Sequence, residues 1–314
     1  MSEDGLKENS LTIIKKMMEL SEKTQEDTSM LVDEILHSIF FLEVINDTKF
    51  SPNNIVRDEK MLNELKTRFP NPFDHYSSRL PKRSPISCVL DMIVRLIGQE
   101  NENQIIKMLQ DVIRPKSGDN NSKKKRFTSS TICVSQKTEG PDSARYYGVS
   151  MSTSGRHPGR IMVAASCLSA WDSHVADAVM TYCPGTTKKS YFDGTIQLPE
   201  SVRCQAFSLS TGDEMPPCRS CGNLFGLYKN TEDEGWAYGN CAEVESLSNL
   251  LKNENEVKKQ VQPTSQMCKD ENRQKAKKET KDHLLDLLQK VKFKTGLEFY
   301  TPQRGLPLRN GGNV

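Results

Sequence analysis

Two short motifs, PCRSC at residues 217–221 and CAE at residues 241–243, decide how the centre of this chain is interpreted. Each motif places a cysteine where a helix is expected to begin, and the free N–H groups and dipole of a helix start favour negative sulfur. Three thiolates suit zinc and leave a fourth position open to water, while a neighbouring carboxylate can move protons. The spacing therefore predicts a Zn²⁺ site with the ligands Cys218, Cys221 and Cys241 and the catalytic group Glu243.

Both motifs resemble those of the cytidine deaminase-like superfamily of zinc-dependent nucleobase deaminases. In that superfamily the helix with the [HC]-A-E triplet precedes the helix with P-C-x-x-C, whereas here the order is reversed. The resemblance covers the motifs and the region around them, about residues 145–252. It implies hydrolytic deamination of a nucleobase in a nucleoside, a nucleotide or a nucleic acid. It also implies that zinc is the cofactor, that water is the nucleophile, and that Glu243 is the acid and base.

The resemblance further implies the fold. It implies a three-layer α/β deaminase-like domain with a mixed sheet. The helical spacing of apolar residues in the N-terminal part adds a helical domain before it, so the predicted fold class is α/β (α+β). A metal site is recognised by the positions of its atoms, and similar constellations occur in different chain orders. The reversed order of the two motifs is therefore compatible with both helix starts meeting at one metal ion.

The alternative is a non-enzymatic protein in which the cysteines form a closed structural zinc site and the N-terminal helices bind a protein partner. A closed site needs a fourth protein ligand, and the candidates are His174, Cys183 and Cys204. Most single histidines are not ligands, and a buried cysteine often serves only for packing. The coordination shell separates the two hypotheses, because an enzyme keeps one position for water.

Several residues near the third cysteine allow two interpretations. Trp236 and Tyr238 can stack on a base or can anchor a loop, and Asn240 can bind substrate or cap the following helix. Glu243 itself, if not catalytic, would complement the dipole of the first helical turn. The sequence leaves these alternatives open.

Length and composition set limits on the whole chain. With 314 residues it can bury a sizeable core and accommodate two units. Hydrophobic residues make up 35% of the chain and charged residues 27%, so part of it is expected to be solvated. The formal net charge is only +2, which by itself gives no strong case for nucleic-acid binding.

The number of cysteines and the lack of long apolar segments indicate the cellular compartment of the protein. There are nine cysteines, an odd and scattered set, which favours reduced thiols over a disulfide framework. The N-terminal residues MSEDGLKENS lack the apolar core of a signal peptide. No apolar run is long enough to span a membrane. We therefore expect an intracellular protein, in the cytoplasm or the nucleus, with no membrane association.

Four segments are predicted along the chain. Residues 1–114 show helical spacing of apolar side chains, and residues 115–126 form a flexible basic linker that has no apolar side chain from Lys116 to Arg126. Its run Lys123–Arg126 fits a solvated linker better than a nuclear-import or phosphate-contacting patch. Residues 127–255 form the zinc-binding domain. Residues 256–314 form a charged connector, a short helix at 282–292 and a disordered tail from 301.

Within residues 127–255, local patterns predict individual elements. Residues 146–152 and 160–167 are expected to be two strands of a hairpin, because a turn-rich stretch separates them. A helix is expected at 170–182 and a further strand at 201–209. The two cysteine motifs then begin two helices, the second of which is amphipathic.

Overall fold

The computed structural model describes residues 3–46, 49–113, 127–140, 143–153, 155–228, 235–263, 265–293 and 296–307. The linker predicted at 115–126 lies outside these residues. The helices of the first part are α1 (Glu3–Lys23), α2 (Ser29–Ile45), α3 (Pro52–Ile55), α4 (Glu59–Arg68), α5 (Pro70–His75), α6 (Pro85–Ile97) and α7 (Glu102–Ile113). The helical character predicted for residues 1–114 is therefore confirmed over the described part.

The central helix of this part is α2, which is apolar on nearly every side. Phe40 and Phe41 are fully buried, and α1, α5 and α6 pack around the helix. The start of α6 shows how the local sequence determines where a helix begins. Pro85 occupies the first turn, where its missing N–H costs nothing, and the Ser84 side chain accepts a hydrogen bond from the N–H of Ser87.

The sheet is antiparallel. Its strands β1 (Thr131–Lys137), β2 (Arg145–Val149), β3 (Val202–Ser208) and β4 (Glu214–Met215) lie in the order β2-β1-β3-β4. All pairings between these strands are antiparallel, so the mixed sheet predicted from the family resemblance is wrong for the described residues. The register shows how β3 becomes antiparallel to β1. The start of β3 lies beside the end of β1, where Val202 pairs with Lys137, and β3 then runs in the opposite direction along β1. The mixed α and β class is confirmed.

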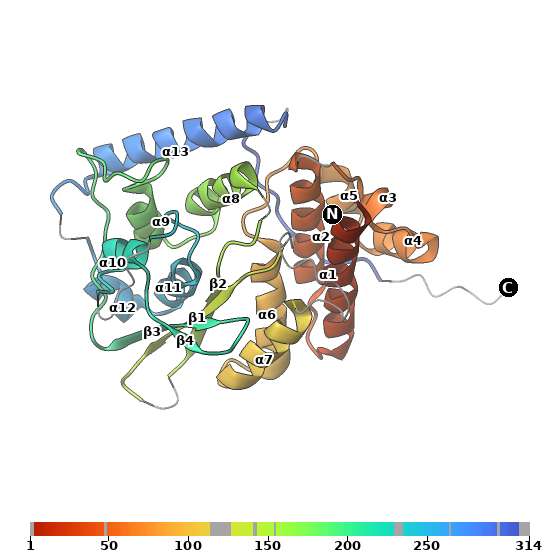
Figure 1. Ribbon diagram of the computed structural model, residues 1–314, viewed down its shortest axis with the longest axis horizontal. Helices are drawn as coiled ribbons and strands as arrows, with labels where there is room; N and C mark the ends of the chain where they lie inside the picture. Colours follow the sequence, from red (N-terminus) through yellow and green to blue (C-terminus); the bar gives the residue numbers. More distant parts are fainter. Residues whose placement is uncertain are drawn as a thin grey trace.

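The sheet lies between two layers of helices (Figure 1). Alternate side chains point to opposite faces, so Ile132 and Val134 join the core formed by the N-terminal helices, whereas Cys133 packs against the other layer. That other layer includes α11 (Ala242–Asn253), which packs on β1, β2 and β3. One hydrophobic core therefore includes side chains from both the N-terminal helices and the sheet. The division into separate domains stays a prediction.

The segment after β2 differs from the prediction. Residues 160–167 belong to helix α8 (Arg156–Ser169) and not to a strand. A buried apolar run cannot be assigned to helix or strand from periodicity alone. Gly155, at φ +90°, reverses the chain before the helix, and Ala164 and Ala165 then favour helical packing because their side chains are small. Helix α9 (Ser173–Met180) follows, within the range predicted for a helix.

The C-terminal part is more structured than its composition indicates. Helices α10 (Arg219–Phe225), α12 (Asn255–Gln260) and α13 (Asp270–Lys290) complete the helical set. The buried face of α13 begins with the small residues Ala276 and Thr280, and the helix packs along α8 (Figure 1). Residues 301–307 have no regular secondary structure, and the N–H of Leu306 donates to the carbonyl of Arg68 at the end of α4 over 2.7 Å. Residues 308–314 lie outside the described part.

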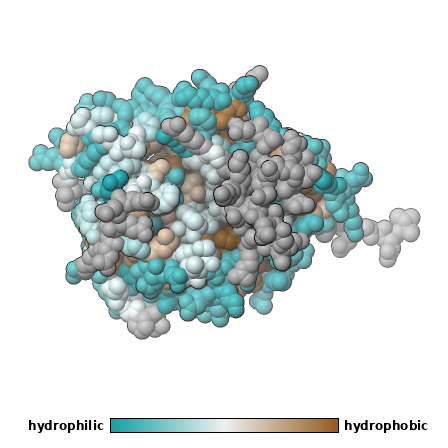
Figure 2. All heavy atoms as spheres, in the orientation of Figure 1, coloured by the Kyte–Doolittle hydropathy of each residue, from teal (hydrophilic) through white to brown (hydrophobic). Residues whose placement is uncertain are grey.

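The surface facing the viewer in Figure 2 is mostly hydrophilic, with only small areas of hydrophobic residues. Among the described helices, none combines the length and the apolar character that a membrane span requires.

Candidate metal centre

The starts of two helices bring the predicted ligands together. Cys218 is the residue immediately before α10, and Cys221 lies in the first turn of that helix. Cys241 is the residue immediately before α11. Both preceding residues have extended backbone, so each sulfur projects toward a helix start, where free N–H groups favour negative charge.

The three sulfur atoms form one cluster. The Sγ atom of Cys218 lies 3.8 Å from that of Cys221 and 3.4 Å from that of Cys241, and all three lie within 4.8 Å of one another. Zinc–sulfur bonds of about 2.3 Å at tetrahedral angles require sulfurs roughly 3.8 Å apart. The arrangement therefore fits a single metal ion with small adjustments. The predicted convergence of Cys218, Cys221 and Cys241 is confirmed, and the cluster could bind a metal ion.

The protonation of these thiols is strongly uneven. Hydrogen bonds with Cys221 and with Cys241 lower the pKa of Cys218 to about 2. The pKa values of Cys221 and Cys241 are raised, because their hydrogen bonds to Cys218 and their burial favour the neutral thiol. Metal binding therefore releases protons, since a thiol must ionise to become a ligand.

Hydrogen bonds fix α11 over the sheet. The Glu245 side chain accepts from the N–H of Val149 at 2.9 Å, and the hydroxyls of Ser135 and Ser246 are also 2.9 Å apart. One turn further on, the amide of Asn249 donates to the carbonyl of Tyr147 at 2.9 Å. These contacts position the helix start that carries Cys241.

Gly148 in β2 allows this close approach. A Cβ atom at Gly148 would lie 2.3 Å from the backbone nitrogen of Ser246 and 2.6 Å from the carbonyl oxygen of Ala242. Both contacts are much shorter than ordinary van der Waals distances, so any other residue would push the first turns of α11 away from the sheet. The glycine therefore sets the distance between the sheet and the helix that begins after Cys241.

Glu243 lies beside the sulfur cluster and is almost completely buried, with 5% of its surface exposed. The pKa of its carboxyl group is raised to about 7, mainly by burial and also by the nearby Cys218 thiolate. The Cys221 side chain hydrogen-bonds to it and acts in the opposite direction. A carboxyl group with a pKa near 7 can both accept and donate a proton at neutral pH.

A cavity of about 280 Å³ opens onto the cluster and Glu243. Its walls come from distant parts of the chain and include Thr131, Ser150, Met215, Trp236, Asn240 and Glu243. Cys218 and Cys241 also line it. A small molecule in this cavity can therefore reach both the sulfur cluster and the buried carboxyl group. This combination of apolar walls and a few convergent polar groups is typical of ligand sites.

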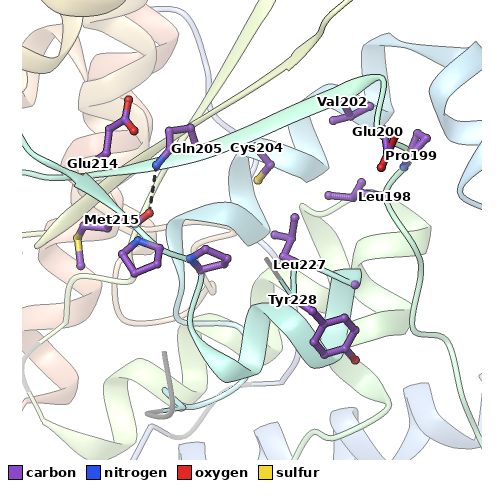
Figure 3. A pocket seen from close by; sticks show the side chains of 13 residues that line it. Leu198, Pro199, Glu200, Val202, Cys204, Gln205, Glu214, Met215, Leu227 and Tyr228 are labelled. Carbon is purple, nitrogen blue, oxygen red and sulfur yellow. Dashed lines mark hydrogen bonds between the residues drawn. The ribbon is translucent and has the colours of Figure 1, made fainter. Parts of the chain in front are cut away.

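A second, larger hollow of about 670 Å³ adjoins the first at Met215 and Pro216. It follows the edge of β3 beyond the short strand β4. Figure 3 shows Glu214 and Glu200 at opposite ends of this hollow, with Cys204 between them. Near one end, the side-chain amide of Gln205 donates to the carbonyl of Met215 at 3.1 Å. The cavity beside the sulfur cluster therefore has neighbouring space along the sheet edge.

The fourth-ligand candidates lie outside the cluster. Among the described residues, the group with metal-ligand geometry consists of the three cysteines and excludes His174, Cys183 and Cys204. His174 lies in α9, where burial lowers its pKa. Cys204 lies on β3, with its sulfur 3.6 Å from that of Cys133. The described part of the chain therefore offers three candidate ligands in this cluster.

The structure separates the residues whose roles the sequence leaves open, Trp236, Tyr238 and Asn240, into two groups. Trp236 and Asn240 line the cavity, as a substrate-contacting role requires. Tyr238 instead stacks on Tyr182 with ring centres 3.9 Å apart, and its hydroxyl accepts from the Asn223 amide at 2.9 Å. Tyr238 is therefore a loop anchor.

Sequence reasoning missed the opposite wall of the cavity. Ser130, Thr131 and Ser150 lie at strand ends far from either cysteine motif, and Met215 ends β4 two residues before the first motif. No local pattern marks them, because their role comes from the strand pairing. The short run of apolar and β-branched residues in TICVSQK was the available signal for β1 itself.

Comparison of the chain with protein-family models, with curated proteins and with solved structures finds no match.

Proposed function

We propose that this protein is a zinc-dependent hydrolytic deaminase that acts on a nucleobase. The observation that carries the proposal is the cluster of Cys218, Cys221 and Cys241 beside a cavity that also holds Glu243. This is the donor set and the acid/base group of zinc deaminases, as the motif resemblance implies. The soft sulfur ligands and their separations favour zinc over hard cations such as magnesium.

The chemistry assigns a distinct role to each group. Cys218, Cys221 and Cys241 would hold zinc, which when bound makes water a nucleophile near neutral pH. Water adds its oxygen to the ring carbon that carries the exocyclic amine. Glu243 accepts a proton from the water and donates one to the amine, which leaves as ammonia while the ring carbon becomes a carbonyl. The raised pKa of Glu243 suits both transfers.

The number of ligands favours an enzyme over the alternative, a structural zinc site with a helical partner-binding surface. A structural site normally takes four protein ligands, whereas a catalytic site keeps one position for water. The described residues group three ligands, and a cavity lies beside them. We also propose an intracellular location, in the cytoplasm or the nucleus, because the nine cysteines are free and the ligands must remain reduced.

The test is ammonia release from zinc-loaded protein with cytosine and adenine substrates as free bases, nucleosides, nucleotides and single strands. Glu243→Gln should retain zinc and fold but lose activity by about 10²–10⁴-fold, because an amide cannot accept and return the proton. Cys241→Ala should lose zinc and stability as well as activity. Cys268→Ser is the matched control, since Cys268 lies outside the cluster.

Two results would reject the proposal. One is wild-type activity that survives Glu243→Gln. The other is the absence of ammonia release from every substrate in a protein whose zinc has four protein ligands, which would favour the structural role.

A further inference from the structure

Three hydroxyl groups form a connected polar group at the wall of the cavity. Ser130, Thr131 and Ser150 all line the cavity beside the sulfur cluster. The Ser130 hydroxyl lies 3.3 Å from that of Thr131 and 3.4 Å from that of Ser150. The Ser150 hydroxyl also accepts hydrogen bonds from the backbone N–H groups of Ser130 and Thr131, at 3.1 Å and 3.2 Å. The start of β1 and the end of β2 are therefore held together where they carry these hydroxyls.

Strand alternation places Thr131 on the side of the sheet that α11 covers. Thr131 and Cys133 are two residues apart in β1, so their side chains lie on the same face. Cys133 shares a small hydrophobic cluster with Ala242, which directly follows Cys241. The Thr131 hydroxyl also contacts the sulfur atom of Met215, another residue of the cavity wall, at 3.9 Å. The hydroxyl group of Thr131 is therefore on the same side of the sheet as the sulfur cluster.

The wall with the hydroxyl groups is also fixed relative to the third cysteine. The Ser129 hydroxyl donates to the carbonyl of Ser150 at 2.7 Å. The next residue, Met151, donates its N–H to the carbonyl of Asn240 at 2.8 Å, and Asn240 directly precedes Cys241. A site that is already ordered in this way binds its ligand without the cost of ordering these groups.

The groups that line the cavity differ in depth. Glu243 is almost completely buried, Thr131 is half-buried and Ser130 is exposed. The cavity therefore runs from the buried carboxyl group to the hydroxyl groups at its mouth. In cytosine and adenine nucleosides, the sugar is attached on the side of the base that lies away from the amine. A base whose amine lies beside Glu243 consequently directs its sugar toward the hydroxyl groups.

We propose that Ser130, Thr131 and Ser150 bind the 2′- and 3′-hydroxyl groups of a ribose, so that the substrate is a ribonucleoside unit. This inference rests on the proposed function, because it assumes that the base enters with its amine toward the metal. Each of the three protein hydroxyls is both a donor and an acceptor, as are the hydroxyls of a ribose. A deoxyribonucleoside lacks the 2′-hydroxyl and a free base lacks the sugar. The ribose belongs either to a free nucleoside or to an RNA strand.

The experiment measures binding separately from turnover. Zinc-loaded full-length Glu243→Gln protein is titrated by calorimetry with cytidine, adenosine, their 2′-deoxy and 2′,3′-dideoxy forms, and the free bases. RNA and DNA hexamers of each base are titrated in parallel. An RNA hexamer that binds more tightly than the nucleoside places the ribose in a strand, and one that binds more weakly places it in a free nucleoside. Either result supports the inference if the DNA hexamer binds more weakly than the RNA hexamer.

Two variants remove single hydroxyl groups, and a third is their control. Thr131→Val keeps the β-branched shape of the side chain, and Ser130→Ala changes an exposed position where folding tolerates it. Thr211→Val is the matched control, because Thr211 is exposed in the turn between β3 and β4 and lies outside the cavity lining. Urea denaturation verifies that each variant is folded.

We expect a ribonucleoside to bind about fivefold or more tightly than its 2′-deoxy form, and the dideoxy form and the free base to bind more weakly still. Lost hydrogen bonds between neutral groups predict a change of this size. Thr131→Val should weaken ribonucleoside binding by about fivefold and leave the affinity for the dideoxynucleoside within about twofold. Ser130→Ala should act in the same direction, and Thr211→Val should change neither affinity. Equal affinity for the three sugars, an equal loss for all compounds in Thr131→Val, or no binding of any compound would overturn the inference.

The two proposals fail in different ways. Ammonia release by the wild type at equal rates from ribonucleosides, deoxyribonucleosides and free bases would overturn the role of the hydroxyl groups and leave the deaminase function standing. Binding that depends on the ribose and on Thr131, without ammonia release from any substrate, would support the ribose site and reject the function.

Discussion

Substitution of Gly148 tests how the sheet controls the metal centre. In Gly148→Ala the new Cβ atom would lie 2.3 Å from the backbone nitrogen of Ser246, whereas ordinary contacts begin near 3.4 Å. The helix α11 and strand β2 must therefore separate by about 1 Å, because both contacting atoms belong to backbone and cannot rotate away. Overpacking of this kind typically costs about 1–3 kcal/mol in the free energy of unfolding.

The same displacement should affect the metal. Ala242, whose carbonyl oxygen is the second close contact, directly follows the ligand Cys241. A shift of about 1 Å is large compared with the tolerance of roughly 0.2 Å in metal–ligand distances, so zinc affinity should fall by about tenfold or more. Stability is measured by urea denaturation and zinc affinity by competition with a chromophoric chelator.

Gly140→Ala is the matched control, because the nearest atom to its new Cβ, the Ser143 hydroxyl oxygen, is 4.0 Å away. It should leave both quantities unchanged. A Gly148→Ala protein with wild-type stability and zinc affinity would refute the claim that this glycine fixes the distance between α11 and the sheet.

Two further predictions concern the N-terminal part. His37 is fully buried and burial lowers its pKa to about 3, so the native state cannot take up the proton that the unfolded state binds below pH 6.5. The free energy of unfolding should therefore decrease as pH falls, by up to about 2 kcal/mol between pH 6.5 and 5. His37→Phe should remove this part of the acid sensitivity and keep the ring stack on Tyr300. Urea denaturation at several pH values checks this, and an identical pH profile for the variant would contradict it. Limited proteolysis should cut first within residues 115–126, because residues 116–126 lack an apolar side chain. The two fragments should nevertheless elute together in gel filtration, because they share one core. Separate elution of the fragments would disprove the shared core.

The convergence of the three cysteines was predictable from the sequence because the pattern that places them is local. Cysteines within one helical turn, and a cysteine directly before an amphipathic run, define helix starts as well as ligands. The helix that follows Cys241 was predicted from the spacing of Val244, Leu247 and Leu251 alone, and these three residues are buried.

Other features depend on contacts between distant segments. The apolar run at 160–167 fits a strand and a helix equally well, and packing against α13 selects the helix. The long helix α13 shows little amphipathic signal at its start, because Ala276 and Thr280 are the residues on its buried face. The direction of β3 and the cavity wall at Thr131 follow from strand register, which local composition does not encode.

The central claim is a catalytic metal site with three sulfur ligands. X-ray absorption spectroscopy at the zinc edge, on protein purified with zinc and with its metal content measured, tests this claim most directly. We predict one zinc per chain with three sulfurs at about 2.3 Å and one oxygen at about 2.0 Å, and the loss of one sulfur in Cys241→Ala. A shell of four protein ligands without oxygen, or a protein that binds no zinc, would contradict it.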